Sequence, residues 1–427
     1  MPLETAFTMD TSSIKFGPGV TREIGQDMRN LGCSRVMVCT DPNLKGSEPV
    51  EVTLAALRSV GLEFELFAES RVEPTDVSFK QAIAFAVEGE FDGYIGVGGG
   101  SSMDTAKAAN LYASHPADLL DYVNPPIGKG IPVPGPLKPM ICVPTTAGTG
   151  SETTGVAIFD LLEMDAKTGI AHRVLRPLMG VIDPHNTRGM PKMVTASTAL
   201  DQVSHALESL TALPYDQRSA PADVAERPAY QGANPISDIW ATACLNMISR
   251  NLLRVIEDPS DEEARGQIML GATYAGIGFG NAGVHLCHGM SYPVSGMVKE
   301  YRAPDYPQEH PIVPHGMAVI LNAPAVFRWT APTNPTLHLR CAELMGADVR
   351  GTTPEDAGNV LADTIIGLMR KVGLPNGLSA VGFGPEDVDA LVAGTLPQHR
   401  VTKLSPRPVS AEALKEMFLG NMTHWDE

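Results

Sequence analysis

The stretch Asp92-Gly93-Tyr94-Ile95-Gly96-Val97-Gly98-Gly99-Gly100-Ser101-Ser102-Met103-Asp104 decides the fold of this chain. It begins as an apolar strand, passes through the glycines 98–100 and continues as a helical pattern from Ser102 to Tyr112. Glycine lacks the Cβ that would keep a pyrophosphate away, and the first N–H groups of a helix can donate to that group. The stretch therefore predicts a strand–turn–helix phosphate site, although such a turn also occurs without a ligand.

The residues on either side of this stretch alternate short β-branched runs with helical stretches, a pattern typical of βαβ units on a parallel sheet. We expect strands at 34–41, 63–67, 94–97 and 139–143, and helices at 51–60 and 78–88. After Pro191 amphipathic helices dominate, at 236–257, 262–277 and 355–372. We therefore predict an α/β dinucleotide-binding domain over residues 1–190 and an all-α domain over residues 191–427.

A second turn, in the segment 143–152, repeats the combination of glycines and hydroxyl side chains after another expected strand. Two such turns in one α/β domain favour a dinucleotide over a single phosphate. The residues we expect to contact it are Gly98, Gly99, Gly100, Ser101, Asp104, Thr145, Thr146, Thr149 and Ser151.

Asp41 ends the expected strand at 34–41 and bears on the choice of nucleotide. A carboxylate there can accept hydrogen bonds from the ribose hydroxyls of the adenosine and would repel a 2′-phosphate, which favours NAD over NADP. The alternative is that Asp41 caps its own turn, Asp41-Pro42-Asn43.

Composition excludes several classes of protein. The 427 residues carry 32 Lys and Arg against 49 Asp and Glu, a net charge of −17, which argues against nucleic-acid binding. No apolar run approaches the length of about 18 residues that a membrane span needs. The six cysteines form no Cys-x-x-Cys pair, which indicates reduced thiols. Because residues 1–10 show no secretion or organelle signal, we expect a cytoplasmic protein, and we expect it to form a homo-oligomer, a dimer or larger.

Asp201 and His205 stand four residues apart on an expected helix that begins near Ser197, with Glu208 on the same stripe. His288 and His315 follow later, each beside a glycine. Three imidazoles and one carboxylate suit Fe²⁺, Zn²⁺, Co²⁺ or Ni²⁺. The alternative is that these are structural histidines. His285 is either a substrate or proton-relay group on the face of His288, or structural.

The ordered set of these motifs resembles the iron-containing (group III) alcohol dehydrogenase family. The motifs are Gly98-Gly-Gly-Ser-x-x-Asp104, Thr145-Thr-x-Gly-Thr-Gly-Ser-Glu152, Asp201-x₃-His205-Ala-x-Glu208, His288 and Pro314-His315-Gly316. The resemblance covers nearly the whole chain. It implies the dehydroquinate synthase-like architecture, a metal held by Asp201, His205, His288 and His315, and iron as that metal, with zinc as the alternative.

The resemblance adds two further residues. Lys167 matches a family position near the nucleotide, whereas Tyr292 stands where other members have a second histidine, four residues after the one matching His288. The resemblance therefore does not carry the proton-relay role of that histidine over to Tyr292.

Within the family, the chain looks most like the branch that passes a hydride from a hydroxy acid to an oxo acid. The segments are 71–76, 120–130, 151–160, 234–240, 276–291 and 394–403. They imply oxidation of 4-hydroxybutyrate with hydride passed to 2-oxoglutarate, through a nicotinamide that stays bound. The alternatives are an NAD-dependent dehydrogenase acting on a simple primary alcohol or on 4-hydroxybutyrate, and a metal-independent enzyme similar to maleylacetate reductase.

In the mechanism that we expect, the metal is a Lewis acid that binds the substrate hydroxyl and lowers its pKa, and the nicotinamide takes the hydride. A substrate carboxylate would then need a cation. Arg400 and Lys403, in the basic run near the C-terminus, are the candidates, and a solvated surface run is the alternative for both.

Overall fold

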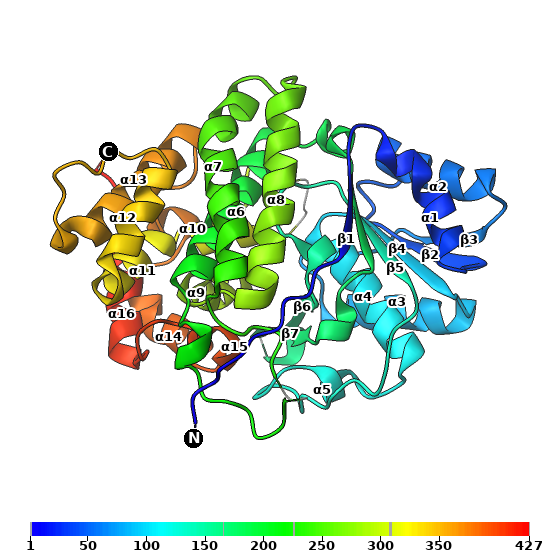
Figure 1. Ribbon diagram of the computed structural model, residues 1–427, viewed down its shortest axis with the longest axis horizontal. Coiled ribbons are helices and arrows are strands. Elements are labelled where there is room, and N and C mark those ends of the chain that lie inside the picture. Colours follow the sequence, from blue (N-terminus) through cyan, green and yellow to red (C-terminus); the bar gives the residue numbers. More distant parts are fainter. Residues whose placement is uncertain (1, 165, 225–226, 307–309, 427) are drawn as a thin grey trace. The chain divides into compact units, whose positions relative to one another are not determined.

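The computed structural model describes residues 2–164, 166–224, 227–306 and 310–426, and the chain forms two compact units (Figure 1). The α/β unit is Asp10–Met190, and the helical unit combines Met1–Met9 with Pro191–Glu427. The sequence analysis assigns residues 1–9 to the first domain, and this assignment is wrong. The backbone N–H of Glu4 donates to Arg218 O at 2.8 Å, and the Glu4 carboxylate pairs with Arg227 at 3.0 Å. These partners are more than 200 residues away, so local pattern could not reveal them.

A six-stranded sheet in the order β1-β8-β5-β4-β2-β3, parallel throughout, is the centre of the α/β unit. Its strands are β1 (Ser13–Phe16), β2 (Arg35–Cys39), β3 (Glu63–Phe67), β4 (Gly93–Gly98), β5 (Met140–Pro144) and β8 (Met179–Ile182). The helices of the unit are α1 (Ile24–Asn30), α2 (Glu48–Ser59), α3 (Asp76–Gly89), α4 (Gly100–Ser114) and α5 (Leu119–Tyr122).

Successive residues of β4 enter the cores on opposite faces of this sheet. Ile95 and Val97 belong to a cluster with residues of α1 and α2, whereas Tyr94 belongs to a cluster with residues of α3 and α4. All six residues of β4 are buried. Helices on both faces of a buried parallel sheet are the arrangement that the sequence predicted.

A separate antiparallel hairpin, which the sequence analysis missed, joins β6 (Val156–Leu161) to β7 (Ala166–Ala171). Its register places Lys167 opposite Asp160. The hairpin packs on the α/β unit through buried residues such as Phe159 and Ile170. Charged residues within both strands weaken the apolar pattern by which strands are recognised.

The helical unit contains α6 (Lys192–Thr211), α7 (Pro235–Glu257), α8 (Glu262–Ala282), α9 (Leu286–Gly296), α10 (His315–Ile320), α11 (Ala323–Thr330), α12 (Pro335–Leu344), α13 (Ala357–Val372), α14 (Val388–Thr395), α15 (His399–Thr402) and α16 (Ala411–Gly420). Helix α6 packs against α7, α8 and α10 and is buried at nearly every position after Thr195. It begins at Lys192, after Pro191 at its N-cap, and not near Ser197 as we expected.

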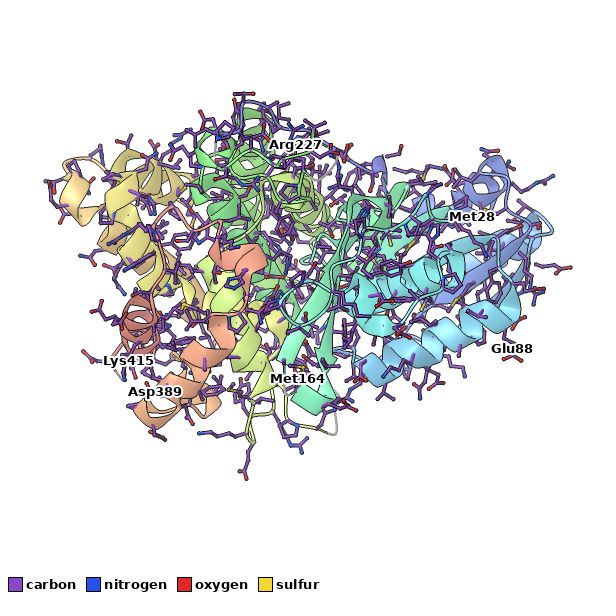
Figure 2. The ribbon with its side chains drawn as sticks, turned by 90° about the horizontal axis from the view of Figure 1, so that it is seen from below. Met28, Glu88, Met164, Arg227, Asp389 and Lys415 are labelled. Carbon is purple, nitrogen blue, oxygen red and sulfur yellow. The ribbon has the colours of Figure 1, made fainter. Side chains whose placement is uncertain are left out.

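The surface of the helical unit carries isolated ion pairs. Figure 2 shows Asp389 of α14 and Lys415 of α16 close together, and the Nζ–Oδ1 distance is 2.9 Å. Both side chains are largely exposed, so the pair adds little to stability. All six cysteines are buried and unpaired, which confirms the prediction of free thiols. Within the described parts of the chain, no helix has the length and apolarity that crossing a bilayer requires.

Candidate functional site

Helix α6 carries three acidic or imidazole side chains on one stripe: Asp201, His205 and Glu208. Positions four and seven residues apart lie on one face of a helix. Here that face points into the helical unit. Only 1%, 3% and 0% of the surfaces of Asp201, His205 and Glu208 are exposed. Buried groups of this kind need partners, and two other helices supply them.

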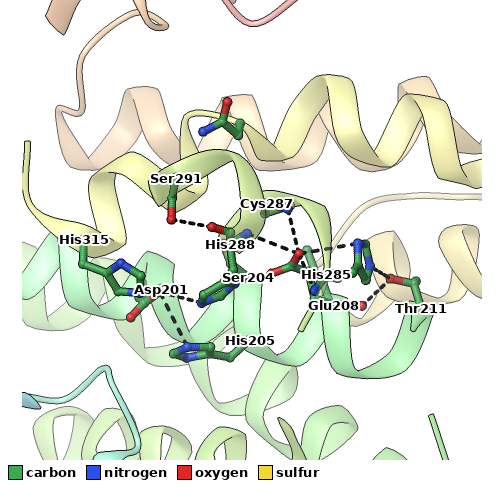
Figure 3. Close-up of polar contacts among 12 residues, drawn as sticks. Asp201, Ser204, His205, Glu208, Thr211, His285, Cys287, His288, Ser291 and His315 are labelled. Atoms are coloured by element: carbon green, nitrogen blue, oxygen red, sulfur yellow. Dashed lines mark hydrogen bonds and ion pairs between the residues drawn. The ribbon is translucent and has the colours of Figure 1, made fainter. Parts of the chain in front are cut away.

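His288 of α9 and His315 of α10 meet Asp201 from those helices (Figure 3). From Asp201 Oδ1, the Nε2 atom of His288 lies at 3.7 Å, that of His205 at 3.8 Å and that of His315 at 4.0 Å. Each of Asp201, His288 and His315 offers one potential metal-ligand atom, and these three atoms lie within 4.8 Å of one another. His205 adjoins this set and stacks on the ring of Phe279, with centroids 3.9 Å apart.

These distances suit a bound divalent metal. Two ligand atoms at about 2.1 Å from a tetrahedral metal lie about 3.4 Å apart, slightly closer than the pairs found here. His288 Nε2 is buried and, among the residues that the structure describes, has no hydrogen-bond partner. A buried imidazole nitrogen that has no hydrogen-bond partner can use its lone pair to bind a metal. The donor set of imidazole and carboxylate is compatible with iron or zinc and does not choose between them.

Gly316 explains how His315 reaches Asp201. A Cβ at Gly316 would lie 2.3 Å from the carbonyl oxygen of Ser197 and 2.9 Å from Asp201 Cβ. Helix α10 therefore contacts α6 backbone to backbone at this point, which only glycine permits. The adjacent His315 is the more accessible of the set, with 28% of its side chain exposed.

Glu208 is the residue whose role the sequence analysis did not foresee. Its Oε1 accepts backbone N–H groups at the start of α9, from His285 at 3.0 Å and from Cys287 at 2.7 Å. Its Oε2 accepts from His288 Nδ1. Burial alone would raise the pKa of Glu208, but His288 and His285 outweigh it and hold that pKa below its usual value. Glu208 is thus an ionised carboxylate that caps α9 and orients His288.

His285 lies deeper than the metal set. Its Nε2 is 2.9 Å from Thr211 Oγ1, and its Nδ1 is 3.5 Å from Glu208 Oε1. The residue is fully buried, and burial lowers its pKa to about 4. These contacts support the structural interpretation of His285 rather than a substrate or proton-relay role.

The glycine turn lies at the carboxyl ends of the central strands of the α/β unit. Strand β4 pairs in parallel with β2 and with β5. The chain adds β3 on one side of β2 and β4 on its other side, so the strand order reverses between β2 and β4, which is where doubly wound sheets bind ligands. The backbone N–H of Thr145 donates to Gly98 O at 2.9 Å. Cβ positions built at Gly99 and Gly100 approach Thr146 and Thr149, at 3.5 and 2.8 Å. The two predicted turns therefore lie side by side.

Four other predicted nucleotide contacts are engaged within the protein. Asp104 accepts from Ser151 Oγ at 2.6 Å and from Ile158 N at 3.0 Å. Lys167 pairs with Glu73 and, at 2.9 Å, with Asp160. Asp41 is buried and accepts from Asn43 N at 2.9 Å, so it caps its own turn. These bonds favour structural roles, and the nucleotide contacts of these four residues stay predictions.

Ser101 also has a contact within the protein, since its Oγ accepts the backbone N–H of Glu73 at 3.3 Å. It remains partly exposed at the start of α4.

Replacing Gly99 with alanine tests the phosphate turn. Gly99 has φ −73° and ψ −176°, which any residue adopts, and an added Cβ meets nothing closer than 3.5 Å. We therefore expect Gly99→Ala to fold normally and to bind NAD at least about tenfold more weakly, because the methyl group would contact the pyrophosphate. Fluorescence titration and thermal unfolding measure the two properties. Gly189→Ala, at an exposed glycine with open space around it, is the control. Unchanged NAD affinity would exclude this turn as the phosphate site.

The two basic residues proposed for substrate binding have different environments. Lys403 is exposed, which favours the surface interpretation that the sequence left open. The guanidinium of Arg400 instead contacts Tyr292 and Tyr230. Tyr292 lies on α9, one turn after His288.

Comparison with known proteins places this geometry in a family. The family model described as iron-containing alcohol dehydrogenase matches residues 11–184, and the model described as the C-terminal part of the Fe-containing alcohol dehydrogenase family matches residues 224–422. The chain belongs to the iron-containing alcohol dehydrogenase family. The resemblance seen in the motifs is confirmed, and the protein is an oxidoreductase with the metal site of that family.

Curated relatives of this family member match nearly its whole length. Hydroxyacid-oxoacid transhydrogenase, mitochondrial, of Xenopus tropicalis is 55% identical over 421 residues, which cover 98% of this chain and 91% of the relative. The human protein of the same name is 54% identical, covering 98% and 90%. The probable hydroxyacid-oxoacid transhydrogenase of Dictyostelium discoideum is 49% identical, covering 98% and 79%.

Solved structures confirm the predicted architecture of this iron-containing alcohol dehydrogenase. A 1,3-propanediol oxidoreductase superposes with a TM-score of 0.85 at 26% identity, covering 98% of this chain and all of that one. The alcohol dehydrogenase of Oenococcus oeni gives 0.84 at 25% identity, covering 97% and 100%.

The expected cytoplasmic location is contradicted by these relatives. Those of Xenopus, human and Dictyostelium are named as mitochondrial proteins. The prediction rested on the absence of a targeting signal in residues 1–10, and such an absence does not establish where a protein is located.

Proposed function

We propose that this enzyme oxidises a small hydroxy acid such as 4-hydroxybutyrate and passes the hydride to 2-oxoglutarate. The observation that carries this proposal is the identity of 55% over nearly the full chain to a hydroxyacid-oxoacid transhydrogenase. The grouping of Asp201, His288 and His315 supports it, because a metal-independent enzyme like maleylacetate reductase has no need of that set.

We propose Asp201, His205, His288 and His315 as the ligands of a divalent metal, iron by family resemblance, and NAD as the nucleotide at the glycine turns. A metal bound there would activate the substrate oxygen as a Lewis acid, and the nicotinamide would carry the hydride. A homo-oligomer also stays a prediction.

The residues of the chain prepare that chemistry by fixing the ligands. Glu208 accepts from His288 Nδ1 and leaves the Nε2 lone pair directed toward Asp201. The stacking of His205 on Phe279 fixes its ring plane. Rigid ligands reduce the reorganisation that accompanies charge development on the substrate oxygen.

The test supplies 4-hydroxybutyrate, deuterated at C4, and 2-oxoglutarate to metal-loaded protein without added nucleotide. We expect succinic semialdehyde and 2-hydroxyglutarate in equal amounts, with deuterium at C2 of the hydroxyglutarate. Turnover that requires added NAD would instead favour a simple dehydrogenase, the candidate to which the structural similarity with 1,3-propanediol oxidoreductase points. No oxidation of 4-hydroxybutyrate under either condition would contradict the proposed substrate.

A further inference from the structure

Arg400, on the short helix α15, holds its guanidinium in a partly buried position against two tyrosines. Its Nη2 donates to the hydroxyl of Tyr292, and its Cζ lies 5.1 Å from the centre of the Tyr230 ring. The Nη1 atom is buried and finds no hydrogen-bond partner in the described part of the chain. The two tyrosines thus fix the side chain while one of its donor groups remains unused.

The positive charge of Arg400 has no carboxylate partner among the residues that the structure describes. Several other arginines of the helical unit pair with acids, as Arg227 does with Glu4 and Arg254 with Asp261. Around Arg400 the described residues supply tyrosine hydroxyls and no carboxylate. Burying a guanidinium donor without an anion costs free energy, and guanidinium matches a carboxylate in geometry and charge. The position therefore suits an anionic ligand.

Arg400 contacts helix α9, the helix that also carries the proposed metal ligand His288. Tyr292 follows His288 by four residues, so both side chains lie on one face, about 6 Å apart along the axis. Helix α15 packs on α9, since a Cβ at Gly289 would lie 3.3 Å from Val401 Cγ2. The guanidinium accordingly contacts the same face of α9 that presents the metal-binding imidazole.

We infer that Arg400 binds the carboxylate of the hydroxy-acid and oxo-acid substrates, and that Tyr292 positions it, an inference that rests on the proposed function. In an extended 4-hydroxybutyrate the hydroxyl oxygen and the farther carboxylate oxygen are about 6 Å apart, from five bonds that are each about 1.5 Å or less. A metal–oxygen bond of about 2 Å at one end and a hydrogen bond of about 3 Å to the guanidinium at the other lengthen this span. The total exceeds the rise of about 6 Å along α9 from His288 to Tyr292. Arg400 thereby selects charged substrates over neutral alcohols of equal length.

The experiment uses succinate, a dicarboxylate that cannot be oxidised at a hydroxyl, as a probe of metal-loaded protein by calorimetry. We expect Arg400→Gln to weaken succinate binding by about 30-fold or more, Arg400→Lys to weaken it less, and Tyr292→Phe to weaken it severalfold. Lys415→Gln, at an exposed lysine paired with Asp389, is the control and should bind like the parent protein. Thermal unfolding of each variant reports any loss of structure separately.

A second readout compares kcat/KM for 4-hydroxybutyrate and for butane-1,4-diol, its neutral counterpart. Arg400→Gln should lower the first at least about 30-fold and leave the second within about threefold. Equal losses for both substrates, or unchanged succinate binding, would overturn the inference. Because the calorimetry needs no turnover, it tests Arg400 even if the parent enzyme fails to oxidise 4-hydroxybutyrate, a result that would contradict the proposed function alone.

Discussion

The Asp201→Asn variant is expected to lose turnover by about 10³-fold or more and to retain little metal after gel filtration. Three imidazole nitrogens lie 3.7 to 4.0 Å from one oxygen of this carboxylate. Removing its charge takes away the only anionic member of the proposed ligand set. A Lewis acid contributes several kcal/mol to stabilising charge on the substrate oxygen, and each 1.4 kcal/mol is about a tenfold change in rate.

The measurement combines metal analysis, turnover and NAD binding. NAD affinity should persist, because the glycine turns belong to the other unit. Asp238→Asn is the matched control: Asp238 is a half-buried aspartate of the helical unit, and burial raises its pKa to about 6. The control should keep its metal. Chelation of the parent enzyme should reproduce the Asp201→Asn defect and added metal should reverse it. Full activity after verified metal removal would exclude the metal mechanism.

The Glu208→Gln variant should show the second largest effect, although Glu208 is not among the proposed ligands. Its two oxygens serve different partners, the backbone N–H groups at the start of α9 and the Nδ1–H of His288. Glutamine has a single oxygen. If that oxygen faces the backbone, the amide NH₂ faces Nδ1 and favours the tautomer that carries its proton on Nε2. If it faces His288, the buried N–H groups lose their acceptor.

Either arrangement has a measurable consequence. We expect about 10- to 100-fold weaker metal binding and a loss of about 1–3 kcal/mol in the free energy of unfolding of the metal-free protein. Excess metal should restore part of the activity, since His288 is still present. Glu343→Gln, at an exposed side chain paired with Arg340, is the control. Parent-like metal affinity together with parent-like stability would show that Glu208 does not orient His288.

Much of the α/β unit could be predicted from sequence because its signals are local. The strand at 63–67 was predicted with the bounds that the structure gives. Buried parallel strands are short apolar runs, and their βα turns need glycine, so both leave a clear pattern. The β6–β7 hairpin was missed because Lys167 and Asp160 interrupt that pattern, although they pair across it.

The candidate metal site could be predicted only in part. The spacing of Asp201 and His205, about one helical turn, predicts that both side chains lie on one face of a helix. His288 and His315 were included as histidines beside glycines, and their approach to Asp201 depends on contacts between helices far apart in the sequence. Gly316 allows one of these contacts, because it has no Cβ to clash with the carbonyl oxygen of Ser197 where α10 meets α6. The local sequence pattern does not predict this contact.

The sequence by itself determined the α/β and helical halves and the side chains offered to a metal, because these depend on periodicity and spacing, and its motifs carried the resemblance to the family. Only the tertiary structure decided what those side chains do. It gave Asp104 and Lys167 protein partners, assigned Glu208 to the orientation of His288, and separated the tyrosine-held Arg400 from the exposed Lys403. The physical reason is that hydrogen bonds and ion pairs act over a few ångströms, and residues within that distance are seldom neighbours in the chain.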